Sequence, residues 1–227
     1  TMKKKIEILG LPIDNYSVRE AILLAEGYLN STSMNIIETV SMKTLADTES
    51  SEAVKEVISL ADLTIIGEKE ILTAANIMTP QRLKETNEHE FFHEFMKRIV
   101  RNHKRLYILA VERTELDRFQ EILDEQYPKR NQVGEAALEE CQGDLENIIN
   151  GVNGEAAEVV ISLIPSPRQE EFIREYRDKM SAQIWYGLGA YTGERKSFFR
   201  KTLQKVFRKH ALMKKMGDYQ NEKEEER

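Results

Sequence analysis

Short apolar runs alternate with longer amphipathic segments along most of this chain. The runs rich in Val, Ile and Leu, each four to six residues long, are Asn35–Val40, Leu63–Ile66, 106–109, 159–163 and 183–186. Between them, apolar residues recur three and four positions apart, as on the inner face of a helix. These helical segments are 17–28, 42–46, 52–60, 70–77, 88–100, 114–126, 145–149 and 168–179. Strands alternating with helices predict an α/β fold, with a Rossmann-like parallel or mixed sheet flanked by helices.

The run 159–163 is the most strongly apolar of these predicted strands, and it is followed by Ile-Pro-Ser-Pro-Arg-Gln-Glu. A β-branched run without charges is typical of a strand buried on both faces. Ser166-Pro167 then predicts a helix start, with Ser166 as the cap and proline in the first helical position. Helix N-termini at the carboxyl ends of parallel strands bind phosphates, and Arg168 and Gln169 would lie in the first turn. An ordinary strand-to-helix junction is the alternative interpretation.

A glycine-rich loop, Gly187 to Gly193, follows the last predicted strand. Glycine allows positive φ angles and a close approach of the backbone to a ligand. Loops of this kind also serve only to turn the chain, so the loop by itself does not establish a binding site.

The segment from His89 to His93 reads His-Glu-Phe-Phe-His, the spacing at which two imidazoles on one helix bind zinc and Glu90 acts as a base. Glu112 lies at a usable separation for a third ligand but belongs to no supporting motif. The phenylalanines of this helix give the competing interpretation, a packed apolar face with the histidines at its flank. A zinc hydrolase is therefore kept as a minor alternative, and no metal site is assigned.

The C-terminal part of the chain is strongly basic, with nine Lys and Arg and no Asp or Glu between residues 195 and 215. Apolar residues there follow helical spacing, which is typical of a helix lying on an anionic membrane surface. The residues expected to contact the membrane are Arg195, Lys196, Phe199, Arg200, Lys201, Lys205 and Arg208. A helix docked on the acidic remainder of the chain, or on a partner protein, remains open. We expect an α/β domain over 1–194, this helix over 195–216 and a disordered charged tail over 217–227.

Composition indicates the cellular compartment and the expected partners. The single cysteine, Cys141, excludes an intramolecular disulfide framework and fits a reducing cytoplasm. The N-terminus lacks the apolar core of a signal peptide, and no run approaches the roughly 20 apolar residues of a membrane span. Because positive charge is confined to one segment of an acidic chain, nucleic acid is not an expected partner.

Several motifs in this order resemble the bacterial WecG/TagA/CpsF glycosyltransferases, which include N-acetylmannosaminyltransferases. The similar segments are the opening ILGLPID (8–14), the motif PRQE (167–170), the loop GLG (187–189) and the basic C-terminal appendage. The resemblance extends from Ile6 to about Met216. It implies a UDP-sugar donor, typically UDP-ManNAc, and a polyprenyl-diphosphate-linked acceptor, with no cofactor and no bound metal. It also implies a cytoplasmic protein, peripheral at the inner face of the cell membrane.

The resemblance also implies the roles of particular residues. Those it assigns to substrate binding are Thr39, Ser41, Arg168, Gln169, Gly187 and Gly189, with Arg168 and Gln169 meeting the phosphates and Thr39 the sugar. Where the family has Pro-Asp-Gly, with the aspartate as general base, this chain has Ile66-Gly67-Glu68. A general base must reach the acceptor hydroxyl, so Glu68 is the nearby substitute.

The resemblance thus implies an inverting transferase that moves an N-acetylhexosamine from a UDP-sugar to a lipid-linked acceptor in cell-envelope polysaccharide or teichoic-acid synthesis. The alternative is a catalytically impaired family member acting as a binding or scaffold partner, since Gly67 replaces the expected aspartate. Whether the chain is an enzyme is thus an open question that leans toward activity. Homo-oligomerisation is also left open.

Overall fold

The computed structural model describes residues 4–191, and the basic segment expected to contact a membrane lies outside this part. The strands are β1 (Lys5–Ile8), β2 (Leu11–Asp14), β3 (Asn35–Val40), β4 (Leu63–Ile66), β5 (Arg105–Ala110), β6 (Asn131–Ala137), β7 (Val159–Ser162) and β8 (Ile184–Gly187). The α-helices are α1 (Val18–Tyr28), α2 (Met42–Asp47), α3 (Glu52–Leu60), α4 (Lys69–Ala74), α5 (Pro80–Asn87), α6 (Glu90–Arg101), α7 (Arg113–Gln126), α8 (Glu146–Gly154) and α9 (Arg168–Tyr176). Two short 3₁₀ helices are η1 (Leu138–Glu140) and η2 (Arg177–Lys179).

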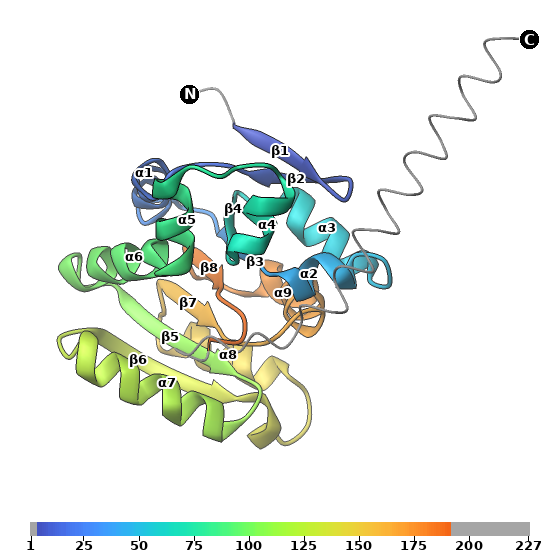
Figure 1. The fold of residues 1–227 in the computed structure, drawn as a ribbon. Helices are drawn as coiled ribbons and strands as arrows, with labels where there is room; N and C mark the ends of the chain where they lie inside the picture. Colours follow the sequence, from blue (N-terminus) through green and yellow to red (C-terminus); the bar gives the residue numbers. More distant parts are fainter. Residues whose placement is uncertain (1–3, 192–227) are drawn as a thin grey trace, which may run out of the picture. The chain divides into compact units, whose positions relative to one another are not determined.

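Six strands form one sheet in the order β4-β3-β8-β7-β5-β6, and every neighbouring pair is parallel (Figure 1). The prediction of a Rossmann-like α/β fold is confirmed, and the sheet is parallel rather than mixed. The antiparallel hairpin β1–β2 lies against this sheet beside β4. It is tied there by Asp14, whose carboxylate accepts hydrogen bonds from the backbone N–H and the hydroxyl of Thr64.

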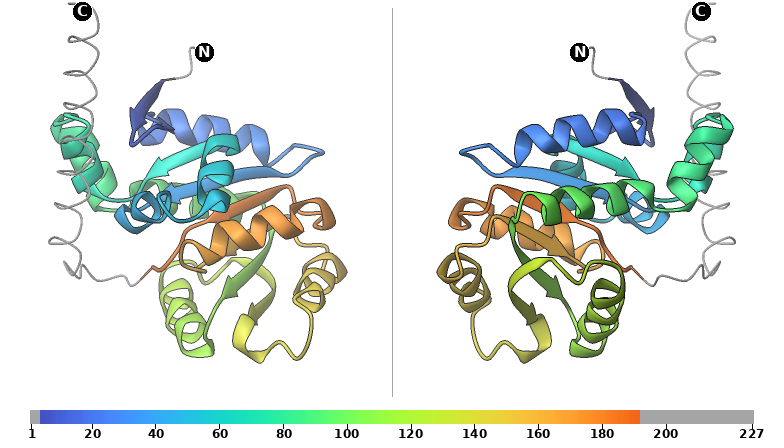
Figure 2. Two further views of the ribbon diagram at one scale, coloured as in Figure 1. Left: turned by 90° about the vertical axis from the view of Figure 1, so that its right-hand side faces the viewer. Right: turned by 90° about the vertical axis from the view of Figure 1, so that its left-hand side faces the viewer.

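Helices cover both faces of the sheet (Figure 2). The core of one face combines α1, α6 and α7 with inward residues of the strands, and the core of the other combines α3, α8 and α9. Successive strand residues point to opposite faces, so Tyr186 packs against Phe91 and Phe95 of α6 while its neighbour Trp185 stacks on Phe172 of α9.

The placement of the connecting helices defines where a ligand can bind. The chain leaves β3 for α3 on one face of the sheet and leaves β5 for α7 on the other. β8 and β7 lie between β3 and β5 in the sheet. Open α/β sheets bind ligands at such a point, outside the carboxyl ends of the strands. A ligand site is therefore expected at the carboxyl edge of β3, β4 and β8, meaning the edge at which these strands end.

Three local expectations differ from the structure. The sequence predicts one helix over 70–77 and none between it and residue 88. In the structure, α4 ends at Ala74 and a further helix, α5, begins at Pro80. Pro80 is the first residue of that helix, where its missing N–H costs nothing. At α9, Pro167 is the N-cap residue and no side chain caps the helix, so the prediction that Ser166 caps it was wrong. β6 is also longer than the short extended piece expected there.

Candidate functional site

A pocket opens at the carboxyl edge on the face of the sheet covered by α1 and α6. Its lining includes Thr39, Gly67, Arg82, Glu85, His89 and Tyr186, and its empty volume, counted out to open solvent, is about 520 Å³. Thr39 is the next-to-last residue of β3, and its hydroxyl lies 3.5 Å from the Tyr186 hydroxyl, to which it donates. Burial raises the pKa of Tyr186 well above its usual value, so this phenol stays protonated at neutral pH.

Gly67, at the position where the resemblance expects a catalytic aspartate, lies tightly against β3. A Cβ atom on this residue would come within 2.7 Å of the Thr39 methyl group and 3.2 Å of the Val40 carbonyl oxygen. Any side chain at position 67 therefore requires Thr39 to move. The ends of β3 and β4 lie so close together that position 67 accommodates only glycine without rearrangement. Position 67 therefore carries no carboxylate.

The neighbouring Glu68 is half-buried and faces the first turn of α2. Its Oε1 atom accepts a hydrogen bond of 3.1 Å from the backbone N–H of Met42. Burial raises the pKa of the Glu68 carboxyl, and the hydrogen bond from Met42 opposes that shift. Ser41, expected to bind substrate, is the N-cap of α2, and its hydroxyl accepts from the Thr44 N–H at 3.0 Å. The structure therefore gives Ser41 a capping role that needs no substrate.

Arg82 is the charged pocket residue that the sequence did not reveal. It lies in the first turn of α5, the helix that was not predicted. Its guanidinium donates to the Glu85 carboxylate at 2.8 Å and to the Asn15 side chain at 3.3 Å. Glu85, itself buried, also accepts from the first backbone N–H of α1, that of Val18. The Thr79-Pro80 pair was the available signal, a helix start rather than a stop.

A second group of polar side chains lies at the same edge on the opposite face of the sheet. We call Glu38, Gln169 and Trp185 the buried triad. Glu38 is completely buried, and its carboxylate accepts from Gln169 Nε2 at 2.7 Å and from Trp185 Nε1 at 3.0 Å. Gly187, the last residue of β8, makes room for this arrangement, because a Cβ there would overlap Glu38 Oε2 and Gln169 Nε2.

A second carboxylate, Glu170, lies close to the triad. Burial, with a smaller contribution from the negative charge of Asp47, raises the pKa of Glu170 to about 7. Burial also raises the pKa of Glu38, as does the charge on Glu170, while the hydrogen bonds from Trp185 and Gln169 act in the opposite direction. Oε2 of Glu170 and Oε1 of Gln169 are buried without a hydrogen-bond partner. Buried acceptors without partners are costly, which marks this cluster as a place where donors are missing.

The other residues expected from the sequence lie around these two groups. Arg168 is exposed at the first position of α9. Gly189 has a φ of +74°, which favours glycine, and its N–H donates to the Ser162 carbonyl at 3.0 Å. The structure thus brings Thr39, Gln169 and Gly187 to one sheet edge, on adjacent strands and the helix that follows.

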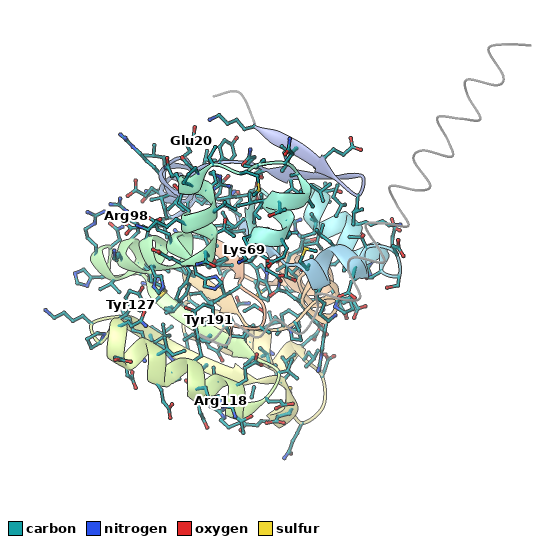
Figure 3. All side chains as sticks on the ribbon, viewed as in Figure 1. Glu20, Lys69, Arg98, Arg118, Tyr127 and Tyr191 are labelled. Atoms are coloured by element: carbon teal, nitrogen blue, oxygen red, sulfur yellow. The ribbon has the colours of Figure 1, made fainter. Side chains whose placement is uncertain are left out.

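The histidines of the zinc motif make aromatic and hydrogen-bonded contacts. His93 Nδ1 lies 2.7 Å from the Tyr127 hydroxyl, and burial lowers the pKa of His93. The His89 ring meets the edge of Tyr191, and Tyr191 also contacts Phe92; Tyr127 and Tyr191 are labelled in Figure 3. Between residues 4 and 191 no three His, Cys, Asp or Glu side chains come together as a set that could hold a metal. The zinc interpretation therefore finds no third ligand in that range.

None of the helices in the described range has the length and apolar character needed to cross a membrane.

Comparison with known proteins identifies the family of the chain. No curated protein matches the chain. The model of the WecG/TagA/CpsF glycosyl transferase family matches residues 6–193, which is most of the sequence and nearly all of the domain described above. The chain belongs to the WecG/TagA/CpsF family, whose members are glycosyltransferases of cell-envelope polymers.

Proposed function

We propose that this protein transfers an N-acetylhexosamine, of the ManNAc type, from a UDP-sugar to a polyprenyl-diphosphate-linked acceptor. The family match over residues 6–193 carries the proposal. The carboxyl edge of the sheet supports it, because open α/β sheets bind nucleotides there. Thr39 lines the pocket on one face of this edge, and Gln169 and Gly187 lie at the same edge on the opposite face. The product would be a lipid-linked intermediate of cell-envelope polysaccharide or teichoic acid.

The proposed chemistry is a single inverting displacement. The acceptor hydroxyl oxygen attacks the anomeric carbon, the bond from that carbon to UDP breaks, and UDP leaves with the bonding electrons. The hydroxyl proton passes to Glu68. A raised carboxyl pKa suits a general base, since it brings the group closer to the working pH. No step is assigned to a metal or a cofactor.

Replacement of Glu68 tests this assignment. Glu68→Gln keeps the shape of the side chain and an oxygen that can accept from Met42, but it removes the base. We expect turnover to fall about 100-fold to 10,000-fold with the KM for the donor little changed. The measurement is transfer of radiolabelled sugar to an acceptor sugar linked to an isoprenoid diphosphate, with the exposed neighbour Glu70→Gln as the matched control. Turnover equal to that of the unaltered protein would remove Glu68 from the mechanism.

A membrane location is part of the proposal. The lipid-linked acceptor resides in the bilayer, and the basic segment from residue 195 carries the pattern of a surface-binding helix. Vesicles containing anionic lipid should bind the full chain and should not bind a version ending at Glu194. Equal binding by the two proteins would contradict a membrane role for this segment.

One observation favours a second candidate function, that of a non-catalytic partner protein. Gly67 leaves no carboxylate where the family resemblance expects one, and Glu68 is already engaged by the start of α2. Thermal unfolding with UDP and a panel of UDP-sugars separates the two functions. A donor at about 100 times its Kd should add roughly 2.7 kcal/mol to the free energy of unfolding. Stabilisation by one UDP-sugar supports the transferase, and no response to any of them supports the partner protein.

A further inference from the structure

The buried triad contains a carboxylate that the proposed reaction does not use. Glu38 lies on β3, one residue before Thr39, and its side chain is on the face of the sheet opposite the pocket. Its carboxyl group accepts hydrogen bonds from Gln169 and Trp185, and within residues 4–191 it forms no ion pair. A buried carboxylate without a basic partner is expensive, so its presence between two N–H donors calls for an explanation.

The position of Glu38 determines which end of the Gln169 amide is available. A side-chain amide has a donor end, NH₂, and an acceptor end, the carbonyl oxygen. Trp185 Nε1 donates to Oε1 of Glu38 and Gln169 Nε2 donates to Oε2 at 2.7 Å, so the donor end of the amide is held on Glu38. The acceptor end, Oε1, is left buried and without a partner on a side chain that is only 2% exposed.

We propose that Glu38 is a positioning residue, which holds the Gln169 amide so that its carbonyl oxygen accepts a hydrogen bond from an N–H or O–H group of the sugar nucleotide. This inference rests on the proposed function and changes one expectation within it. A carbonyl oxygen cannot donate to a phosphate, so Gln169 recognises a hydroxyl, an acetamido N–H or the imide N–H of the base. The exposed Arg168 remains the phosphate candidate on this helix.

Gly187 supports the inference independently of the hydrogen bonds. This residue ends β8 and directly faces Glu38 across the β3–β8 pair. A Cβ there would overlap both Glu38 Oε2 and Gln169 Nε2, so the contact between them exists only because position 187 has no side chain. The glycine of this loop thus serves the triad, in addition to any contact between its backbone and a ligand.

The variant Glu38→Gln tests the proposal, because it should reverse the Gln169 amide while the side chain at position 38 keeps its shape. In Glu38→Gln, the new carbonyl oxygen stays on Trp185, and the new NH₂ group then faces Gln169. Gln169 must turn to accept from it, which presents NH₂ where the carbonyl oxygen was. We expect the KM and the Kd of the UDP-sugar to rise about 10-fold to 100-fold, with kcat and the midpoint of thermal unfolding changed much less. Affinity equal to that of the unaltered protein would overturn the proposal.

Two further variants separate positioning from simple packing. Adding Gln169→Glu to Glu38→Gln exchanges the two side chains, so that a carboxylate oxygen again points away from residue 38. We expect this double variant to recover at least 5-fold of the lost affinity. Val152→Ala, in the core of the same face, should lower stability and leave affinity within about 3-fold, because it has no polar contact with the triad. The opposite pattern, in which affinity follows stability across all variants, would also overturn the proposal.

Nuclear magnetic resonance of the full chain gives a readout that needs no ligand. The side-chain NH₂ signal of Gln169, assigned by its loss in Gln169→Glu, should exchange slowly with solvent and should exchange at least 10-fold faster in Glu38→Ala. The same rate in both proteins contradicts the contact itself. If the unaltered protein binds no UDP-sugar, the proposed function fails, and the exchange rates still decide whether Glu38 holds the amide.

Discussion

The two faces of the strand pair β3–β8 use adjacent residues in opposite ways. On the pocket face, Thr39 and Tyr186 make one long contact of 3.5 Å beside an open volume. On the triad face, Glu38 and Trp185 are completely buried and make hydrogen bonds of ordinary length. The pocket face therefore has fewer hydrogen bonds to break when a ligand arrives, and the triad face is held by its own hydrogen bonds before any ligand arrives. Pre-organised groups of this kind lower the cost of binding.

Charge also differs between the two faces. In the pocket, the positive charge of Arg82 is balanced by Glu85 at 2.8 Å. Beside the triad, two carboxyl groups, Glu38 and Glu170, are buried near each other. Burial raises the pKa of both, and the charge on Glu170 also raises the pKa of Glu38. The pocket face is close to neutral, while the triad face is rich in acceptors. A ligand that bridges both would present its hydrogen-bond donors to the triad face.

Adding a methyl group at the two glycines gives the largest expected contrast between the faces. Gly187→Ala forces its Cβ onto Glu38 and Gln169, which are locked by their own hydrogen bonds, and should cost about 3 kcal/mol of unfolding free energy. Gly67→Ala meets the end of the Thr39 side chain at 2.7 Å and should cost about 1 kcal/mol. Urea denaturation measures both values, and equal losses would mean that the two faces are equally tight.

Removing one polar group from each of two adjacent residues should have a smaller effect. Trp185→Phe deletes the donor to a buried carboxylate and leaves a small cavity, so we expect a loss of about 2 kcal/mol. Tyr186→Phe deletes only the hydroxyl near Thr39 and should cost about 0.5 kcal/mol or less. Thermal and urea unfolding of both proteins test this order. A greater loss for Tyr186→Phe would contradict the assignment of the rigid network to the triad face.

The sequence predicted the sheet better than it predicted the site, for reasons that particular residues make clear. Each strand run carries its signal locally, in consecutive apolar residues such as 159–163, and the structure confirms all five. Glu38 carries no local signal, because the partners that explain a charge in a buried strand lie 131 and 147 positions away. Arg82 was missed because no helix was expected between residues 77 and 88, whereas Pro80 begins α5.

Ser41, unlike Glu38, does carry a signal in the sequence, but that signal fits two different roles. The family resemblance assigned it to substrate, but the spacing to Thr44 is also that of a capping pair, and the structure uses it in that way. Gln169 was correctly placed at the carboxyl edge, yet the sequence could not say which end of its amide would be available. That depends on Glu38, and only the folded arrangement supplies it. The residues that distinguish the two faces are thus the ones least accessible to sequence analysis.

The last contrast between the faces is a dependence of stability on pH that belongs to the triad face. The pKa of Glu170 is raised to about 7 by burial, above its value in the unfolded chain. A raised carboxyl pKa means that the folded state keeps its proton at a pH where the unfolded state has released it. Its contribution to stability is therefore fully present below about pH 4 and is lost as the pH rises through about 7.

Glu170→Gln should remove this dependence, since the amide mimics the protonated acid at every pH. Relative to the unaltered protein, we expect the variant to gain on the order of 1–2 kcal/mol of unfolding free energy between pH 5 and pH 8. Urea denaturation at several pH values measures it, with the exposed neighbour Glu171→Gln as the control. A residual slope of the same sign should remain, because burial raises the pKa of Glu38 as well. Parallel curves for the variant and the unaltered protein would mean that Glu170 is not buried as the acceptor-rich face requires.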